Sequence, residues 1–242
     1  MKNNWYLDWF DSNYYHVLYK DRDEKEAEFF IDNIVSHLQI QKKSKLLDVA
    51  CGKGRHAIYF NKKGLNVVGI DLSYNSINIA KKHESKTLQF KVHDMRKEFK
   101  KNEFDIVTNL FTSFGYFDEE KEEQDTINSM AKNLKKEGVL IIDFMNVKKT
   151  MLNLITYEKK TVNAINFKIY RKIKNNQIIK DIKFSDNNIK YHFEEKVKAL
   201  TLDDINLFII NAGLKIVNIF GNYKLEDFNA LNSDRLIIVC KK

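Results

Sequence analysis

The stretch KLLDVACGKGRHAIY, which runs from Lys45 to Tyr59, decides the fold of this chain. It begins with a short apolar run, passes through a loop that contains Gly52 and Gly54, and continues into an amphipathic pattern typical of a helix. Glycines allow a loop backbone to adopt unusual dihedral angles and to approach a ligand closely. A buried strand, a glycine turn and a helix N-terminus in this order predict a site for a nucleotide-like cofactor.

The composition is that of a globular protein without a membrane segment. Of the 242 residues, 43% are hydrophobic and 31% are charged, which is enough for one sizeable core. Two cysteines, Cys51 and Cys240, cannot build a disulfide framework and fit a reducing compartment. The N-terminus lacks the apolar core of a signal peptide, and no apolar stretch is long enough to span a bilayer. We therefore expect a cytoplasmic protein with no membrane partner, either a monomer or a homodimer.

The formal net charge of +8 fits two interpretations. A polyanion such as RNA is one partner that a basic protein can bind. Alternatively, lysine is simply the default solvated residue of this chain, because its lysine doublets are scattered and several of them close predicted helices, where cations suit the helix dipole. We favour the second interpretation and expect a small-molecule substrate rather than a nucleic acid.

Apolar strands alternate with amphipathic helices from Lys45 onward. Such alternation predicts a parallel sheet that helices cover on both faces. The predicted strands are Lys45–Ala50, Asn66–Asp71, Thr87–Val92, Phe104–Leu110 and Val139–Phe144. The predicted helices cover residues 54–63, 73–83 with Ser73 as the N-cap, and 119–136.

The pattern changes between residues 161 and 199, where three stretches alternate with period two. Asparagine-rich turns separate the stretches, so this region predicts an antiparallel meander inserted after the fifth strand. A helix that begins at Thr201 and two strands, Leu214–Phe220 and Arg235–Cys240, follow it. We expect one domain with four parts: an aromatic helical lid (1–44), a cofactor-binding core (45–149), an inserted β-subdomain (150–200) and the end of the core (201–242). For the aromatic N-terminal residues, a helix packed on the core is the alternative to a lid.

Two acidic residues at strand ends indicate which cofactor binds. Asp71 ends the second predicted strand, where an acidic residue about 20 residues beyond the glycine loop accepts hydrogen bonds from ribose hydroxyls. This pattern alone does not separate NAD from S-adenosylmethionine. However, the loop lacks the third glycine of a pyrophosphate fingerprint, and Asp94 follows the third strand, where it can accept from an adenine amino group. Both features favour S-adenosylmethionine.

Five motifs, in order, resemble those of class I S-adenosylmethionine-dependent methyltransferases. LLDVACGKGRHA resembles their first motif, VVGIDLS the second, VHDMR the third, FDIVTNLFTSFGYF the fourth and NLKKEGVLIIDF the fifth. The resemblance covers nearly the whole chain and implies a Rossmann-like α/β fold. Its seven-stranded, mostly parallel sheet would have an antiparallel last strand, Arg235–Cys240, between the two preceding strands.

The inserted meander and the ending GNYKLEDFNALNSDRLIIV are similar to one subgroup of that class. This subgroup contains glycine N-methyltransferase and the nucleotide-aminosugar N,N-dimethyltransferases, and its substrates are small amines or other small polar nucleophiles. The resemblance therefore implies methyl transfer to a small molecule, with S-adenosylhomocysteine as the second product.

The resemblance also implies the cofactor site. Leu110 and Phe111, after the fourth strand, are expected to line the methyl-transfer channel, and no His/Cys/Asp spacing suggests a metal site. The expected cofactor-binding residues are Ala50, Cys51, Gly52, Gly54, Asp71, Leu72, Asp94, Met95, Leu110 and Phe111.

Substrate contacts are expected from the carboxyl edge of the parallel strands. Tyr15, Tyr19 and Arg235 are the expected positioning residues, and Arg235 is either an ordinary surface arginine or a grip for a phosphate or carboxylate. His56 is a candidate base that we interpret as structural. Further pocket candidates are Tyr116, Asn146, Tyr223 and Ser233.

Two other functions stay open at this stage. The net charge of +8 is compatible with an RNA or protein methyltransferase, and a cofactor-binding module without catalysis is the third hypothesis. The complete absence of proline argues against DNA methyltransferases that use proline-proline-aromatic or proline-cysteine motifs. Intact loop glycines and Asp71 argue against a module that has lost its activity.

Overall fold

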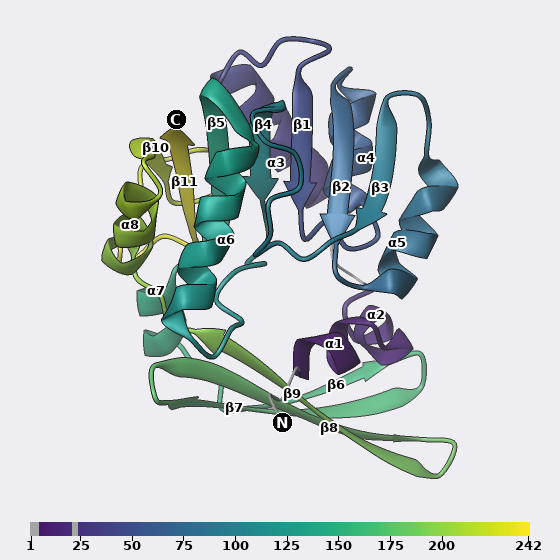
Figure 1. The fold of residues 1–242 in the computed structure, drawn as a ribbon. Coiled ribbons are helices and arrows are strands. Elements are labelled where there is room, and N and C mark those ends of the chain that lie inside the picture. The colour runs from purple at the N-terminus through teal and green to yellow at the C-terminus, as the bar shows by residue number, and fades with distance from the viewer. Residues whose placement is uncertain (1–4, 21–23) are drawn as a thin grey trace.

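A computed structural model describes residues 5–20 and 24–242 of this chain. Seven of the described strands form one sheet: β1 (Lys45–Val49), β2 (Asn66–Asp71), β3 (Leu88–Val92), β4 (Phe104–Asn109), β5 (Leu134–Met145), β10 (Lys215–Phe220) and β11 (Arg235–Lys241). Their order is β10-β11-β5-β4-β1-β2-β3 (Figure 1). β11 runs antiparallel to both of its neighbours, while β1 to β5 are parallel to one another. The predicted fold class is confirmed.

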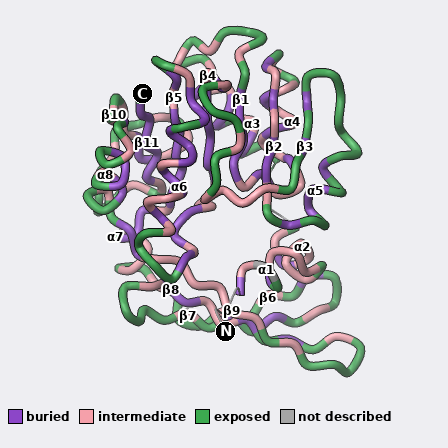
Figure 2. Tube along the Cα trace, in the orientation of Figure 1, coloured by how far each residue is buried: buried purple, intermediate pink, exposed green. Residues whose placement is uncertain are grey.

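Helices cover both faces of this sheet because its strands are apolar on both sides. In β1, Leu46 packs with the helices of one face and the next residue, Leu47, with those of the other. The first group is α3 (Glu24–His37), α4 (Arg55–Lys62) and α5 (Tyr74–Ala80), and the second is α6 (Glu120–Asn133) and α8 (Leu202–Asn211). Figure 2 shows the resulting burial of the central strands. Each such leucine contributes about 1.5–3 kcal/mol by leaving water.

Helix boundaries follow local capping and sheet pairing. Ser73 caps α5 as predicted, because its Oγ accepts from the Ser76 amide at 3.0 Å. The sequence pattern predicted that α6 ends at Lys136, but it ends at Asn133 because Leu134 already pairs with Phe104 in the sheet. Shorter helices that link larger elements are η1 (Lys81–His83) and α7 (Val147–Leu152).

The inserted region is a second sheet of four strands: β6 (Tyr157–Val162), β7 (Ile165–Lys174), β8 (Gln177–Asp186) and β9 (Ile189–Lys198). The prediction of three stretches was wrong by one, because YEKKTV in β6 is an edge strand whose charges conceal its pairing with β7. We call this four-stranded unit the small sheet. The carboxyl ends of β1 and β2 point toward it (Figure 1).

The aromatic N-terminal segment packs on the small sheet. It forms α1 (Trp5–Phe10) and α2 (Asn13–Leu18), and the Trp9 ring lies 4.6 Å from that of Phe193 on β9. Trp9 and Leu18 are buried in a core that they share with Phe167 and Ile182 of the small sheet. Across the described residues, no helix has the length and apolar character needed to cross a membrane.

Candidate functional site

A cavity of about 660 Å³ lies between the carboxyl ends of the parallel strands and the small sheet. Its volume falls within the range of roughly 300–1,000 Å³ typical of small-molecule sites. One end is lined by the loops after β1, β2, β3 and β4, and the other by α1, α2, β8 and β9. The position matches the rule that open α/β sheets bind ligands at the carboxyl ends of their strands.

The glycine loop after β1 uses its two glycines differently. Gly52, with a φ of +55°, lines the cavity, and a Cβ built on it would meet no atom within 4 Å. Gly54, with a φ of +86°, caps α4, and a Cβ there would come within 2.7 Å of the Phe90 ring. Gly54 is not a lining residue, and its role in the structure is to let α4 and β3 pack closely, while its expected contact with the cofactor stays a prediction.

Asp71 joins this loop to the end of β2. Its Oδ2 accepts from the Gly52 amide at 2.8 Å, and its Oδ1 accepts from the Ser73 amide at 2.8 Å. Burial raises the pKa of this carboxyl, while the two amides act in the opposite direction. A carboxylate can accept about four hydrogen bonds, so Asp71 keeps capacity for ribose hydroxyls on the cavity side.

The N-terminal segment closes over this end of the cavity through Asp11. Its Oδ1 accepts from Ser73 Oγ at 2.5 Å and from the Asn75 amide at 3.1 Å, and its Oδ2 accepts from Asn75 Nδ2 at 2.7 Å. These contacts tie the turn between α1 and α2 to the N-terminus of α5. The same segment therefore packs on the small sheet and encloses the cavity.

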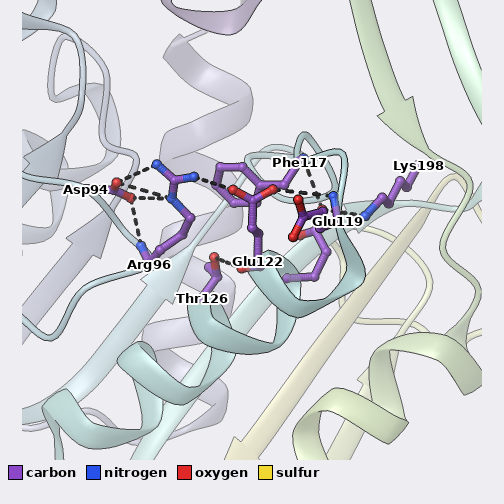
Figure 3. Close-up of polar contacts among 8 residues, drawn as sticks. Asp94, Arg96, Phe117, Glu119, Glu122, Thr126 and Lys198 are labelled. Carbon is purple, nitrogen blue, oxygen red and sulfur yellow. Dashed lines mark hydrogen bonds and ion pairs between the residues drawn. The ribbon is translucent and has the colours of Figure 1, made fainter. Parts of the chain in front are cut away.

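Asp94 is held by Arg96, beside the cavity. Arg96 Nε donates to Oδ1 of Asp94 at 3.0 Å and Nη2 donates to Oδ2 at 2.6 Å, while Nη1 reaches Glu122 of α6 at 2.7 Å (Figure 3). Burial acts to raise the pKa of Asp94, but the contacts with Arg96 outweigh it and hold that pKa below its ordinary value. Asp94 is therefore an ionised acceptor whose oxygens are already largely engaged. Arg96 also lies over the ring of Phe117, 4.7 Å from its centroid.

The loop after β4 is strained where it lines the cavity. Phe111 has a φ of +61° and Thr112 a φ of +60°, a region that bulky and β-branched residues rarely adopt. Asp143 of β5 holds both: its Oδ2 accepts from the Phe111 amide at 2.9 Å, and its backbone carbonyl accepts from the Thr112 amide at 2.8 Å. The loop is thus fixed from the neighbouring strand.

Arg235 belongs to this support and not to the cavity wall. Its Nε lies 2.7 Å from Oδ1 of Asp143, and its Nη2 donates to Thr112 Oγ1 at 3.0 Å. The guanidinium lies behind Phe111, 5.6 Å from the ring centroid. Arg235 is not a lining residue, and its Nε and Nη2 are engaged by Asp143 and Thr112, so the structure gives it a supporting role in place of the expected grip on an anionic substrate group.

The end of the cavity next to the small sheet combines aromatic and charged side chains. Tyr15 and Tyr19 line it, as expected from the sequence. Lys180 of β8 and Glu195 of β9 line it as well, and sequence reasoning missed both. The signal was present, since each interrupts the apolar face of its strand. The aromatic residues that share this wall are Trp5, Tyr6, Phe10, Tyr116 and Phe117.

The other pocket candidates from the sequence fall into two groups, those that line the cavity and those that do not. Tyr116 and His56 line the cavity, whereas Asn146, Tyr223 and Ser233 do not. Asn146 Nδ2 donates to the carbonyls of Ala230 and Ser233, and the Tyr223 hydroxyl donates to Asp143 at 3.0 Å. These three residues therefore support the last strands and the loop after β4. The expected cofactor residues that line the cavity are Ala50, Cys51, Gly52, Asp71, Leu72, Asp94, Met95, Leu110 and Phe111.

Two buried side chains near the glycine loop, Cys51 and Asp48, have a structural role. Burial raises the pKa of the Cys51 thiol well above its ordinary value, so Cys51 contributes small size and not reactivity. Asp48 of β1, another residue that sequence reasoning missed, is buried below the loop, where Thr108 Oγ1 donates to it at 2.9 Å. Burial raises its pKa to about 7. Among the residues that the structure describes, no cluster of His, Cys, Asp and Glu could hold a metal ion.

The residues present fit S-adenosylmethionine. Space in front of Gly52 allows a ligand to approach the backbone, Asp71 offers acceptors for ribose, and Leu72 and Met95 offer apolar contact for an adenine ring. Fold and site thus define an α/β domain that binds a nucleoside-type ligand at the carboxyl edge of its sheet.

Comparison with known proteins identifies the family. A methyltransferase domain model matches residues 40–198, and the chain belongs to that family. A dTDP-3-amino-3,4,6-trideoxy-α-D-glucopyranose N,N-dimethyltransferase of Streptomyces venezuelae is 34% identical over 101 residues, 41% of this chain and 42% of that protein. A glycine/sarcosine N-methyltransferase of Aphanothece halophytica is 28% identical over 130 residues, 52% of this chain and 48% of that protein. The matched part thus spans about half the length of these relatives.

Solved structures share the fold along almost the whole chain. An S-adenosylmethionine-dependent methyltransferase from Clostridium acetobutylicum has a TM-score of 0.79 at 19% identity, over 94% of this chain and 95% of that one. An amino pentose methyltransferase from Micromonospora echinaspora, solved with S-adenosylmethionine bound, has a TM-score of 0.71 at 19% identity, over 95% and 97%. The small sheet is therefore part of the shared architecture.

Proposed function

We propose that this protein transfers a methyl group from S-adenosylmethionine to a small-molecule amine by in-line displacement. The observation that carries the proposal is one continuous cavity with a nucleoside end and a separate aromatic end. The nucleoside end is built from Gly52 and Asp71, the aromatic end from the N-terminal segment and the small sheet, and Leu110 and Phe111 lie on its lining as well.

The chain's own residues mainly position and enclose the reactants. When bound, S-adenosylmethionine supplies a methyl group that is already electrophilic. Methyl transfer then requires an acceptor held at attack distance along the bond axis, in a site without water. The strained Phe111 and the enclosing aromatic side chains suit that task. A base is needed only for an acceptor that arrives protonated.

An amine acceptor is supported by the relatives. The names of the Streptomyces venezuelae and Aphanothece halophytica relatives describe N-methylation, of an amino sugar and of glycine or sarcosine. The aromatic wall also suits an amine, since aromatic faces attract organic cations as they approach. We therefore place the acceptor nitrogen at the aromatic end.

A labelled-methyl screen tests this function. Protein incubated with S-adenosylmethionine carrying a tritiated methyl group should label small amines, and Asp71→Ala should abolish the incorporation. RNA and peptides belong in the same screen as competing acceptors. Label found in RNA or peptide but in no amine would contradict the proposal, and so would cofactor binding without transfer to any acceptor.

A further inference from the structure

Two charged residues interrupt the apolar face of the small sheet. Ile178 and Ile182 of β8 are buried on one face, and Lys180 lies on that face between them. On β9, Glu195 follows Phe193 on the same face, and the strand register pairs Lys180 directly with Glu195. The two charges therefore lie opposite each other in an otherwise apolar row.

Lys180 and Glu195 form the centre of a polar cluster. Lys180 Nζ lies 2.8 Å from Oε2 of Glu195 and donates to the Tyr19 hydroxyl at 2.5 Å. Oε1 of Glu195 accepts from the Tyr19 hydroxyl at 2.6 Å and from Trp9 Nε1 at 2.7 Å. Burial acts to raise the pKa of Glu195, but Lys180, Tyr19 and Trp9 outweigh it, so that pKa lies below its ordinary value. Glu195 is therefore a carboxylate paired with Lys180.

Folding stability alone does not account for this pair. Removing two charges from water offsets most of their attraction, and hydrophobic residues of similar volume often stabilise such a position better. Lys180, Glu195 and Tyr19 all line the cavity, and the Lys180 side chain keeps 23% of its surface exposed. Charged groups in a cleft are candidates for ligand binding.

The hydrogen-bonding capacity left in the pair indicates what it can bind. A lysine ammonium has three donors, and within the described chain Nζ has two partners, Tyr19 and Glu195. Oε1 of Glu195 accepts twice, whereas Oε2 has Lys180 as its one partner within the described chain. One donor and one acceptor therefore remain side by side. The cluster is neutral in sum, since Lys180 and Glu195 carry opposite charges.

We propose that Lys180 and Glu195 bind a hydroxyl group of the methyl acceptor, which makes the substrate a hydroxylated amine. A hydroxyl is neutral and can accept from Nζ while it donates to Oε2. An amine without it displaces water from Lys180 and Glu195 but supplies no group to replace those hydrogen bonds, which disfavours its binding. This inference rests on the proposed function for the identity of the acceptor, but its hydrogen-bonding argument concerns only Lys180, Glu195 and their partners Tyr19 and Trp9.

Binding of matched amines tests the inference independently of turnover. Protein loaded with S-adenosylhomocysteine is titrated, by ligand-observed NMR, with pairs that differ by one hydroxyl, such as 3-aminocyclohexanol and cyclohexylamine or ethanolamine and ethylamine. The hydroxylated member of at least one pair should bind about 10- to 100-fold more tightly to the wild type. Lys180→Met should reduce this ratio to less than about twofold. Lys183→Met is the matched control, because Lys183 is exposed, pairs with Asp181 and should preserve the ratio.

A second variant guards against a folding defect. Lys180→Met leaves the Glu195 carboxylate without its cation, whereas the double variant Lys180→Met/Glu195→Gln removes both charges and should lose the preference equally. An unchanged ratio in both variants, or no hydroxyl preference in the wild type, overturns the inference. Methylation of amines without a hydroxyl preference would support the proposed function and contradict the inference about Lys180 and Glu195. Hydroxyl-dependent binding without methylation would support the inference about Lys180 and Glu195 and contradict the proposed function.

Discussion

Arg235 of β11 forms an ion pair with the buried Asp143 of β5, with Nε 2.7 Å from Oδ1, and both residues contact the loop after β4 that lines the cavity. Asp143 also accepts from the Phe111 amide and the Tyr223 hydroxyl. An antiparallel last strand therefore supports a strained loop that begins at the end of a parallel one. The pair links the topology of the sheet to the geometry of the site.

Weakening this pair should lower turnover more than cofactor affinity. Arg235→Lys keeps a positive charge near Asp143 but loses the contact with Thr112, so the positive-φ conformation loses support. We expect kcat to fall by about tenfold, which corresponds to about 1.4 kcal/mol, with little change in the Kd of S-adenosylmethionine. Adding Thr112→Gly should recover part of the loss, because glycine adopts a positive φ without strain. Equal loss in the single and double variants would show that the loop conformation is not the cause.

Asp71→Ala should abolish measurable binding of S-adenosylmethionine by calorimetry. The carboxylate is the expected ribose acceptor and also holds the Gly52 amide, so its removal affects both ligand and loop. Asp203→Ala, an exposed position at the start of α8, is the control and should bind normally. Unchanged affinity in Asp71→Ala would mean that the ribose lies elsewhere.

The two loop glycines should respond differently to alanine. Gly54→Ala places a Cβ 2.7 Å from the Phe90 ring and should destabilise the fold by several kcal/mol, as measured by urea unfolding. Gly52→Ala meets no protein atom and should cost only about 1–2 kcal/mol for its positive φ. It should nevertheless weaken cofactor binding, since its Cβ enters the cavity. Equal stability of the two variants would contradict this division.

Glu123 of α6 should make stability fall as the pH rises. It is fully buried and accepts from the amides of Gly115 and Phe117, with Lys198 at 3.6 Å. Burial raises its pKa from 4.5 to about 7, so the folded state binds a proton that the unfolded state releases. The associated stability is complete below about pH 4.5 and is lost by about pH 7, to a maximum of about 3 kcal/mol.

Urea unfolding at about pH 5 and about pH 8 measures this effect. Glu123→Gln should gain stability relative to the wild type as the pH rises, because its amide stays neutral. Asp48, whose pKa is also raised, titrates in both proteins and so drops out of the comparison. Glu120→Gln, on the exposed side of α6, should follow the wild type at both values. A constant difference between Glu123→Gln and wild type would exclude the titration.

The net charge of +8 should not produce specific RNA binding. Several lysines are paired with carboxylates, such as Lys45 with Glu103 and Lys135 with Asp105, which reduces the charge offered to a phosphate backbone. RNA affinity measured between about 50 and 200 mM salt should be weak and unaccompanied by methyl incorporation. Methylated RNA together with a steep salt dependence would favour the RNA methyltransferase alternative.

Local patterns predicted the strands of the sheet and most of the residues that line the cavity at their carboxyl ends, because these depend on neighbours in the chain. Strand, glycine loop and helix follow one another within Lys45–Tyr59, and the pattern placed Asp71 at a strand end. The edge strand β6 was missed because its charges conceal its pairing. Lys180 and Glu195 were visible as breaks in two apolar faces, but their pairing across strands was not.

The sequence by itself determined where strands and helices alternate along the chain, where the glycine loop lies and which strands end in an acidic residue. Each of these features arises from local periodicity and backbone chemistry. Only the tertiary structure decided which of two neighbouring glycines lines the cavity, because Phe90 of β3 occupies the space beside Gly54. It also decided that Arg235 supports a loop, because its partner Asp143 lies 92 residues earlier in the chain. Long-range packing assigns each side chain its partners, and no local pattern contains that information.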